Sequence, residues 1–136
     1  ALVPHRDATA YEALRERARA LGEPAVVVRT LGERREFGAR QAFVANLLGA
    51  GGIRGVDEGS PVAIIASSRS GYAQHAADAV PALRDAGAEQ VWVAGRSREL
   101  GEHAGLVDGE VFDGMDVVAF LDAVLRTLET STGASA

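Results

Sequence analysis

Cysteine and lysine are both missing from this sequence. Without cysteine among the 136 residues there can be no disulfide, thiolate nucleophile or zinc–thiolate site. All 14 basic residues are arginine, and 19 acidic residues bring the net charge to −5, which does not favour general nucleic-acid binding. No apolar run approaches the roughly 20 residues of a membrane span, and no signal peptide is evident, so we expect a protein of the bacterial cytoplasm.

Familiar ligand and catalytic motifs are missing as well. The sequence contains no glycine-rich phosphate loop of the G-x-G-x-x-G or G-x-x-x-x-G-K-[ST] type, and no G-x-S-x-G nucleophile elbow. No two of the histidines, His5, His75 and His103, share a metal-ligand spacing such as i, i+4. We expect His75 and His103 to be structural.

The pattern that is present is a regular alternation of strands and helices. Strands are expected at 25–30, 53–56, 61–66, 90–95 and 109–112, and helices at 38–48, 71–86, 98–104 and 116–128. The continuous apolar run at 61–66 is typical of a central parallel strand, whereas 53–56 could be a short edge strand or a loop. This order predicts an α/β fold with a five-stranded, parallel, doubly wound sheet of the flavodoxin-like (Rossmann) type.

The length and the 47% hydrophobic content suit one domain with a single core. A further helix is expected at 6–21, before the first strand. It is either a solvated helix of the domain or a linker from a missing upstream domain. We expect residues 1–23 to form this linker helix, 24–129 the domain, and 130–136 a disordered tail.

Two groups of polar residues follow predicted strands. Ser67, Ser68 and Ser70 come after 61–66, where they could hold a ligand, although serines in this position more often cap the next helix. The second group follows the first strand and carries both signs of charge, so its members could pair with one another or with a partner's charges. It comprises Glu33, Arg34, Arg35, Glu36 and Arg40.

Three further residues have expected positions. Asp116 should cap the last helix, and Met115 should pack under the crevice or face a partner. Trp92, within a predicted buried strand, is expected in the core.

Four segments together resemble a known family: LGERREFGAR at 31–40, ASSRSGYAQ at 66–74, VAGR at 93–96 and FDGMDVV at 112–118. They are similar to the carboxyl-terminal, cobalamin-binding-like domain of the methylmalonyl-CoA mutase small (beta) subunit. The resemblance covers about 24–128, and the preceding helix resembles the connector from that subunit's barrel domain. The G-M-D-V-V and S-S-x-x-x-Y-A-Q stretches are its specific parts.

The resemblance also implies a departure from the wider cobalamin-binding fold family. Catalytic members carry D-x-H-x-x-G after the first strand, S-x-L after the third and G-G after the fourth, with the histidine coordinating cobalt. Here the corresponding residues are Arg34, Glu36 and Ala39, then Arg69, then Ala94. A carboxylate is a poor substitute for the imidazole, and we expect the arginines and the added methyl group to fill the narrow channel. We therefore predict no cobalamin, and no catalytic, cofactor-binding or metal-binding residue in this chain.

By resemblance, the family's large subunit carries adenosylcobalamin and interconverts (R)-methylmalonyl-CoA and succinyl-CoA. The small subunit is then a catalytically silent partner in a heterodimer, and we expect a structural role for this chain. The alternative is a working cobalamin carrier with an altered lower ligand or none. A receiver-like or flavodoxin-like module is disfavoured, because Ala66-Ser67 and Leu31-Gly32 offer none of the acidic residues that a receiver requires.

Overall fold

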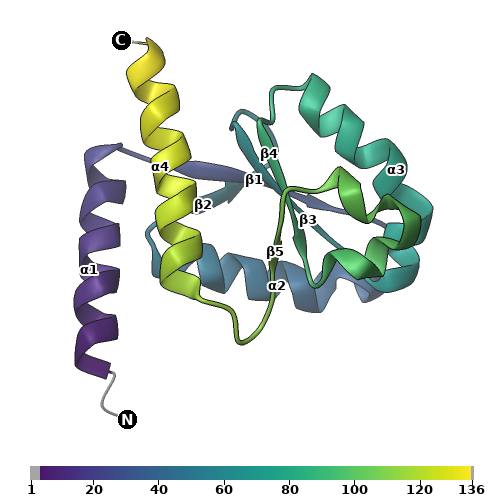
Figure 1. Cartoon of the computed structure of the whole chain (residues 1–136), viewed down its shortest axis with the longest axis horizontal. Helices are drawn as coiled ribbons and strands as arrows, with labels where there is room; N and C mark the ends of the chain where they lie inside the picture. The colour runs from purple at the N-terminus through teal and green to yellow at the C-terminus, as the bar shows by residue number, and fades with distance from the viewer. Residues whose placement is uncertain (1–3, 136) are drawn as a thin grey trace.

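The structure, a computed structural model, describes the backbone of residues 4–135 and the side chains of residues 8–131. A central sheet is flanked by helices on both faces (Figure 1). The elements in chain order are α1 (Pro4–Ala20), β1 (Ala25–Thr30), α2 (Arg34–Ala50), β2 (Arg54–Val56), β3 (Val62–Ala66), α3 (Arg69–Asp85), β4 (Gln90–Ala94), η1 (Ser97–Leu106), β5 (Gly109–Val111) and α4 (Val117–Ser135).

The five strands are all parallel and lie in the order β2-β1-β3-β4-β5. This order is that of a flavodoxin-like, doubly wound sheet, so the predicted fold class is confirmed. The central strand β3 is buried along its whole length, because helices cover both of its faces.

Alternating residues of the strands divide the core into two layers. Val62 and Ile64 pack with α1, α2 and α4 on one face, whereas Ala63 and Ile65 pack with α3 and η1 on the other. In Figure 1, α1 and α4 lie side by side at one edge of the molecule. The α1 helix contributes Leu14 and Ala18 to the core.

Several helix boundaries differ from those predicted, and one predicted helix is of the 3₁₀ type. The α2 helix begins at Arg34 rather than residue 38, because the carboxylate of Glu36 accepts the backbone N–H of Glu33 in a capping box. The segment after β4 is a 3₁₀ helix interrupted at Gly101, where φ is +60°. The α4 helix continues to Ser135, through most of the predicted disordered tail; Ala136 lies outside the described residues.

Within the described part of the chain, no helix combines the length and apolar character needed to cross a membrane.

Candidate functional site

The candidate site lies where the connections of the sheet change direction. The α2 helix after β1 packs on one face of the sheet, and α3 after β3 packs on the other. Doubly wound proteins bind ligands at this point, in a crevice outside the carboxyl ends of the strands. In this chain Leu31, Ser67 and Gly95 directly follow β1, β3 and β4.

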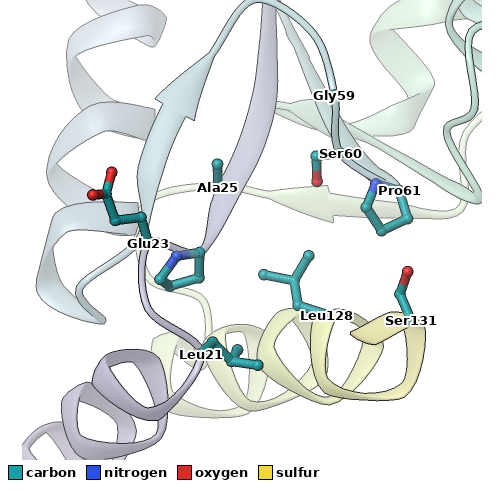
Figure 2. Close-up of a pocket in the computed structure, with 9 residues that line it drawn as sticks. Leu21, Glu23, Ala25, Gly59, Ser60, Pro61, Leu128 and Ser131 are labelled. Carbon is teal, nitrogen blue, oxygen red and sulfur yellow. The ribbon is translucent and has the colours of Figure 1, made fainter. Parts of the chain in front are cut away.

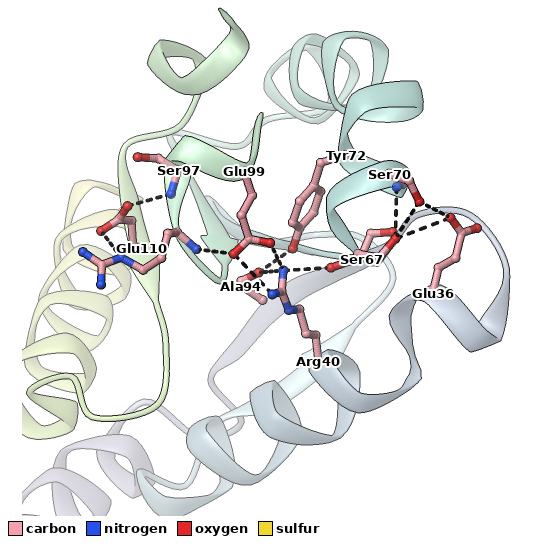
Figure 3. Close-up of polar contacts among 12 residues, drawn as sticks. Glu36, Arg40, Ser67, Ser70, Tyr72, Ala94, Ser97, Glu99 and Glu110 are labelled. Atoms are coloured by element: carbon pink, nitrogen blue, oxygen red, sulfur yellow. Dashed lines mark hydrogen bonds and ion pairs between the residues drawn. The ribbon is translucent and has the colours of Figure 1, made fainter. Parts of the chain in front are cut away.

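Arg40 of α2 reaches into this crevice (Figure 3). Its Nη1 donates to the carbonyl oxygens of Ser67 and Ala94, both at 3.0 Å, and to Oε1 of Glu99 at 2.7 Å. Its Nη2 donates to Oε2 of Glu99 at 3.2 Å. One guanidinium group thus joins the end of β3, the end of β4 and η1.

Tyr72 of α3 enters the same region and is fully buried. Its hydroxyl donates to the carbonyl oxygen of Ala94 at 2.5 Å, and the guanidinium carbon of Arg40 lies 5.8 Å from the centre of its ring. Burial raises the pKa of the Tyr72 hydroxyl, which keeps it a neutral donor. The chain's own side chains therefore occupy the crevice from both sides.

Glu99 balances the charge of Arg40. Its side chain is 11% exposed, and its carboxylate also accepts the backbone N–H of Arg96 at 3.0 Å. Burial acts to raise the pKa of Glu99, but the hydrogen bonds from Arg40 and Arg96 outweigh it and hold the pKa below its ordinary value. The pair is consequently ionised at neutral pH.

Gly95 leaves room for this pair. Its φ is +115°, and a Cβ atom at this position would lie 2.6 Å from Nη1 of Arg40 and 2.7 Å from Oε2 of Glu99. Any side chain here would displace the ion pair as well as strain the backbone.

Glu36 connects the loops after β1 and β3. Its Oε1 accepts the N–H of Glu33 at 2.9 Å, and its Oε2 lies 3.4 Å from Oγ of Ser70 and 3.5 Å from Oγ of Ser68. The backbone hydrogen bond from Glu33 is the main reason that the pKa of Glu36 is lowered. Ser68 also caps α3 by accepting the N–H of Gly71 at 3.1 Å, as predicted.

Glu110, in β5, likewise accepts a backbone N–H, at the start of η1. It accepts the N–H of Ser97 at 2.6 Å and pairs with Arg96 at 3.3 Å. The guanidinium carbon of Arg96 in turn lies 4.1 Å from the centre of the Phe112 ring.

Glu36, Glu99 and Glu110 therefore act alike, because each carboxylate accepts a backbone N–H at the carboxyl edge of the sheet. Backbone N–H groups at the starts of helices are the usual cradle of an anionic ligand in such folds. Here the protein's own anions occupy these donors, and Figure 3 shows the contacts of Glu99 and Glu110.

A hollow of about 300 Å³ remains beside this network. Phe43, Phe112, Arg96 and Asp113 line it together with the Arg40–Glu99 pair. A second hollow, of about 270 Å³, lies at the opposite, amino edge of the sheet (Figure 2). Its charged residue, Glu23, pairs with Arg54 at 3.2 Å, so this second hollow presents no free charge to a ligand.

The two histidines with described side chains, His75 and His103, lie in different elements. His75 is exposed on α3, and His103 is partly buried in η1 near Glu102. His5 belongs to α1, but its side chain lies outside the described residues. Among the side chains that the structure describes, no group of three or more His, Cys, Asp or Glu could hold a metal ion.

The predicted cap at Asp116 is confirmed, and Met115 and Trp92 both contact the core. Asp116 caps α4 by accepting the N–H of Ala119 at 3.0 Å. Met115 is partly buried against the core. Trp92 also packs against the core, edge-to-face with Phe120 at 4.9 Å, although it is only partly buried.

One prediction about the crevice was wrong. Arg34, Ala39 and Arg69 were expected to fill it, but all three are exposed. Arg34 and Arg69 stand at the first positions of α2 and α3, so their side chains lie outside the space between the strands. Arg40 fills the crevice instead, while Ala94 is buried beneath it.

Sequence reasoning missed Glu99, Tyr72 and Gly95. Arg40 had been grouped with the charged cluster, of which only Arg35 and Glu33 form an ion pair with each other, at 3.6 Å. One usable signal was spacing: Arg40 lies one helical turn after Glu36 and so faces the same side of α2. Glu99 is 59 positions away in the sequence, and no local pattern links it to Arg40.

The chain is similar in sequence to several named proteins. It is 33% identical to the methylmalonyl-CoA mutase small subunit of Propionibacterium freudenreichii subsp. shermanii, over 91% of this chain. It is 37% identical to that of Streptomyces virginiae, over 85% of this chain. This chain is homologous to part of the methylmalonyl-CoA mutase small subunit.

The homology is limited to a fraction of each relative. The chain spans 23% of the length of the Propionibacterium small subunit and 21% of the Streptomyces one. The probable methylmalonyl-CoA mutase small subunit of Mycobacterium tuberculosis H37Rv is 34% identical over 90% of this chain and is likewise covered over 23% of its length. No protein-family model matches the chain.

Proposed function

We propose that this chain is a non-catalytic, carboxyl-terminal domain of a methylmalonyl-CoA mutase small subunit. In this proposal it binds no cobalamin and stabilises a heterodimer with the large subunit, which carries adenosylcobalamin and converts methylmalonyl-CoA to succinyl-CoA. The observation that carries it is the crevice at the carboxyl edge of the sheet, which Arg40, Glu99 and Tyr72 occupy.

The residues at the positions of the cofactor motif do not fit a corrinoid. Glu36 stands where the cobalt-binding histidine is expected, and its carboxylate is engaged by Glu33 and by the hydroxyls of Ser68 and Ser70. Coordinating a metal would require Glu36 to give up the bonds that start α2 and join it to α3. A carboxylate is also a weaker match than imidazole for this type of metal.

The space for a nucleotide tail is similarly restricted. Nη1 of Arg40 bonds the carbonyl oxygens of Ser67 and Ala94, so a tail could enter between β3 and β4 only if Arg40 left. If Arg40 left the crevice, the mostly buried carboxylate of Glu99 would lose its counter-ion. These contacts support a domain that has its own side chains in place of a cofactor.

Titration of the purified chain with hydroxocobalamin tests the cofactor part of the proposal. We expect an unchanged visible spectrum of the cobalamin and separate elution of protein and cobalamin on gel filtration. The large subunit, treated in the same way, is the positive control. A red, stoichiometric complex with this chain would support the alternative of a cobalamin carrier.

Co-purification tests the partner. A tagged mutase large subunit from the same cell should retain this chain, and the isolated chain should not convert methylmalonyl-CoA. If the large subunit does not retain it under any ionic condition, the heterodimer role is refuted.

A further inference from the structure

The arginines of this chain divide into two groups. Nearly all arginines with described side chains donate to a carboxylate or a carbonyl oxygen. The exceptions are Arg34, Arg69 and Arg98, which are exposed and form no hydrogen bond or ion pair within the described residues.

These three arginines lie at one edge of the molecule. Arg34 begins α2, Arg69 begins α3, and Arg98 is in the first turn of η1, so all three follow the carboxyl ends of strands. The first turns of α2 and α3 are joined by the contact of Glu36 with Ser70, and η1 is joined to α2 by Glu99 and Arg40. We call Arg34, Arg69 and Arg98 the arginine surface.

The position of Arg69 is unfavourable for the isolated domain, whereas the N-cap Glu33 and Glu36 in the first turn of α2 offset the charge of Arg34. The amino end of a helix carries a partial positive charge, so cations are disfavoured there. The first turn of α3 has no acidic residue to offset Arg69. Residues that oppose a local preference without compensation inside the fold are more often explained by an interaction outside it.

The neighbouring carboxylates form no ion pair with these three arginines, although Arg69 lies near enough to Glu99 to contribute to the lowering of its pKa. Glu36, Glu99 and Glu110 are committed to backbone N–H groups and to internal partners. Of the exposed acidic residues nearby, Glu33 pairs with Arg35 and Glu102 lies near His103, which leaves Asp113 beside the hollow. Arg34, Arg69 and Arg98 therefore carry positive charges that no ion pair within the described residues offsets, on a chain whose net charge is −5.

The arrangement fits carboxylates on a protein better than a small phosphate ligand. A phosphate site at a helix start needs free N–H donors, and here Glu36, Glu99 and Ser68 occupy donors of this kind. The three arginines come from three separate elements, and none of them lines the hollow beside Gly95. Guanidinium groups spread over a surface suit bidentate pairing with separate carboxylates.

We propose that the arginine surface docks this domain onto an acidic patch of the mutase large subunit. This assignment rests on the proposed function, which supplies the partner. Charge pairs of this kind act mainly on the association rate and are screened by salt. Binding should therefore be fast at low ionic strength and slow down as salt is added.

The test measures the association of the intact chain with immobilised large subunit at low and high salt. The variant carries Arg34→Glu, Arg69→Glu and Arg98→Glu. A matched control carries Arg19→Glu, Arg54→Glu and Arg126→Glu, which reverses the same number of exposed arginines on α1, β2 and α4. Circular dichroism and thermal unfolding verify that both variants fold.

We expect the variant to associate at least about tenfold more slowly at low salt and to lose most of its salt dependence, with the control within about twofold of the original chain. Equal slowing of both variants, or none in either, would overturn the arginine surface while leaving the heterodimer intact. Displacement of the large subunit by tripolyphosphate but not by a glutamate-rich peptide would also overturn it, in favour of a phosphate ligand. No binding by the original chain would instead refute the proposed function and this assignment with it.

Discussion

Arg40 makes four hydrogen bonds, of which two go to backbone carbonyls and two to Glu99. Its side chain is 33% exposed, whereas that of Glu99 is 11% exposed, so the carboxylate depends more on the pair than the guanidinium does. The Arg40–Glu99 ion pair thus links α2 to η1 across the carboxyl ends of the strands.

Replacing Arg40 by methionine should lower the free energy of unfolding by about 2–4 kcal/mol, because it leaves a mostly buried carboxylate without a counter-ion. Urea denaturation measures this change. The control is Arg35→Met, whose exposed pair with Glu33 should contribute less than about 1 kcal/mol. If the two variants lose the same amount of stability, the Arg40–Glu99 pair does not stabilise the fold more than the exposed Arg35–Glu33 pair does. Adding Glu99→Leu to the Arg40→Met variant should recover much of the loss.

Individual positions show the limit of reasoning from sequence. The cap at Ser68 and the cap at Asp116 were predictable, because each bond spans three residues. The contact between Arg40 and Glu99 was not, since it requires the relative placement of two helices on a sheet. The same holds for Tyr72, whose partner Ala94 is 22 residues away.

Among the elements, α1 packs closely against the rest of the domain. Leu14 is 4% exposed in the core. Arg17 donates to Asp122 and Glu129 of α4 at 2.6 and 2.9 Å, and these bonds raise the pKa of its guanidinium. Both the apolar and the charged side of α1 thus contact the rest of the fold.

Leu14→Ala should therefore cost about 2–4 kcal/mol of stability, as expected for a leucine removed from a core. Glu12→Ala, an exposed substitution on the same helix, should change the stability by less than about 0.5 kcal/mol. Chemical denaturation of both variants provides the measurement. A Leu14→Ala variant as stable as the original chain would indicate that α1 does not belong to the folding unit.

Element types were more predictable than element ends. The strand order followed from the alternation of strands and helices, and the apolar run of β3 was identified because both of its faces are covered. The start of α2 was misjudged because the Glu33-x-x-Glu36 capping box was overlooked. The end of α4 was placed too early, although no glycine or proline follows Leu128 before Gly133.

Taken together, the carboxylates of the domain predict how its stability depends on pH. The pKa values of Glu36, Glu99, Glu110, Asp122 and Glu129 are all held below their ordinary values by hydrogen bonds. A carboxylate with a lower pKa in the folded state adds stability above its unfolded value, and this contribution is lost as the pH falls through the folded value. Stability should hold at neutral pH and fall as the pH drops below about 4.5.

Comparison with Glu99→Gln isolates one of these groups. The variant should be less stable than the original chain at neutral pH, and the difference should shrink as the pH falls below the ordinary glutamate value of 4.5. Urea midpoints measured across the acidic range provide the data. A difference that stays constant with pH would mean that Glu99 contributes by packing rather than by charge.

The fit of Gly95 against Arg40 and Glu99 limits what a single substitution can do at the crevice. Introducing histidine at position 36 alone would break the capping box and still leave the crevice occupied by Arg40. Removing Arg40 alone would leave the mostly buried carboxylate of Glu99 without its counter-ion. Each of these single substitutions thus lowers stability before any ligand can compensate, so a change at one position alone does not open the crevice.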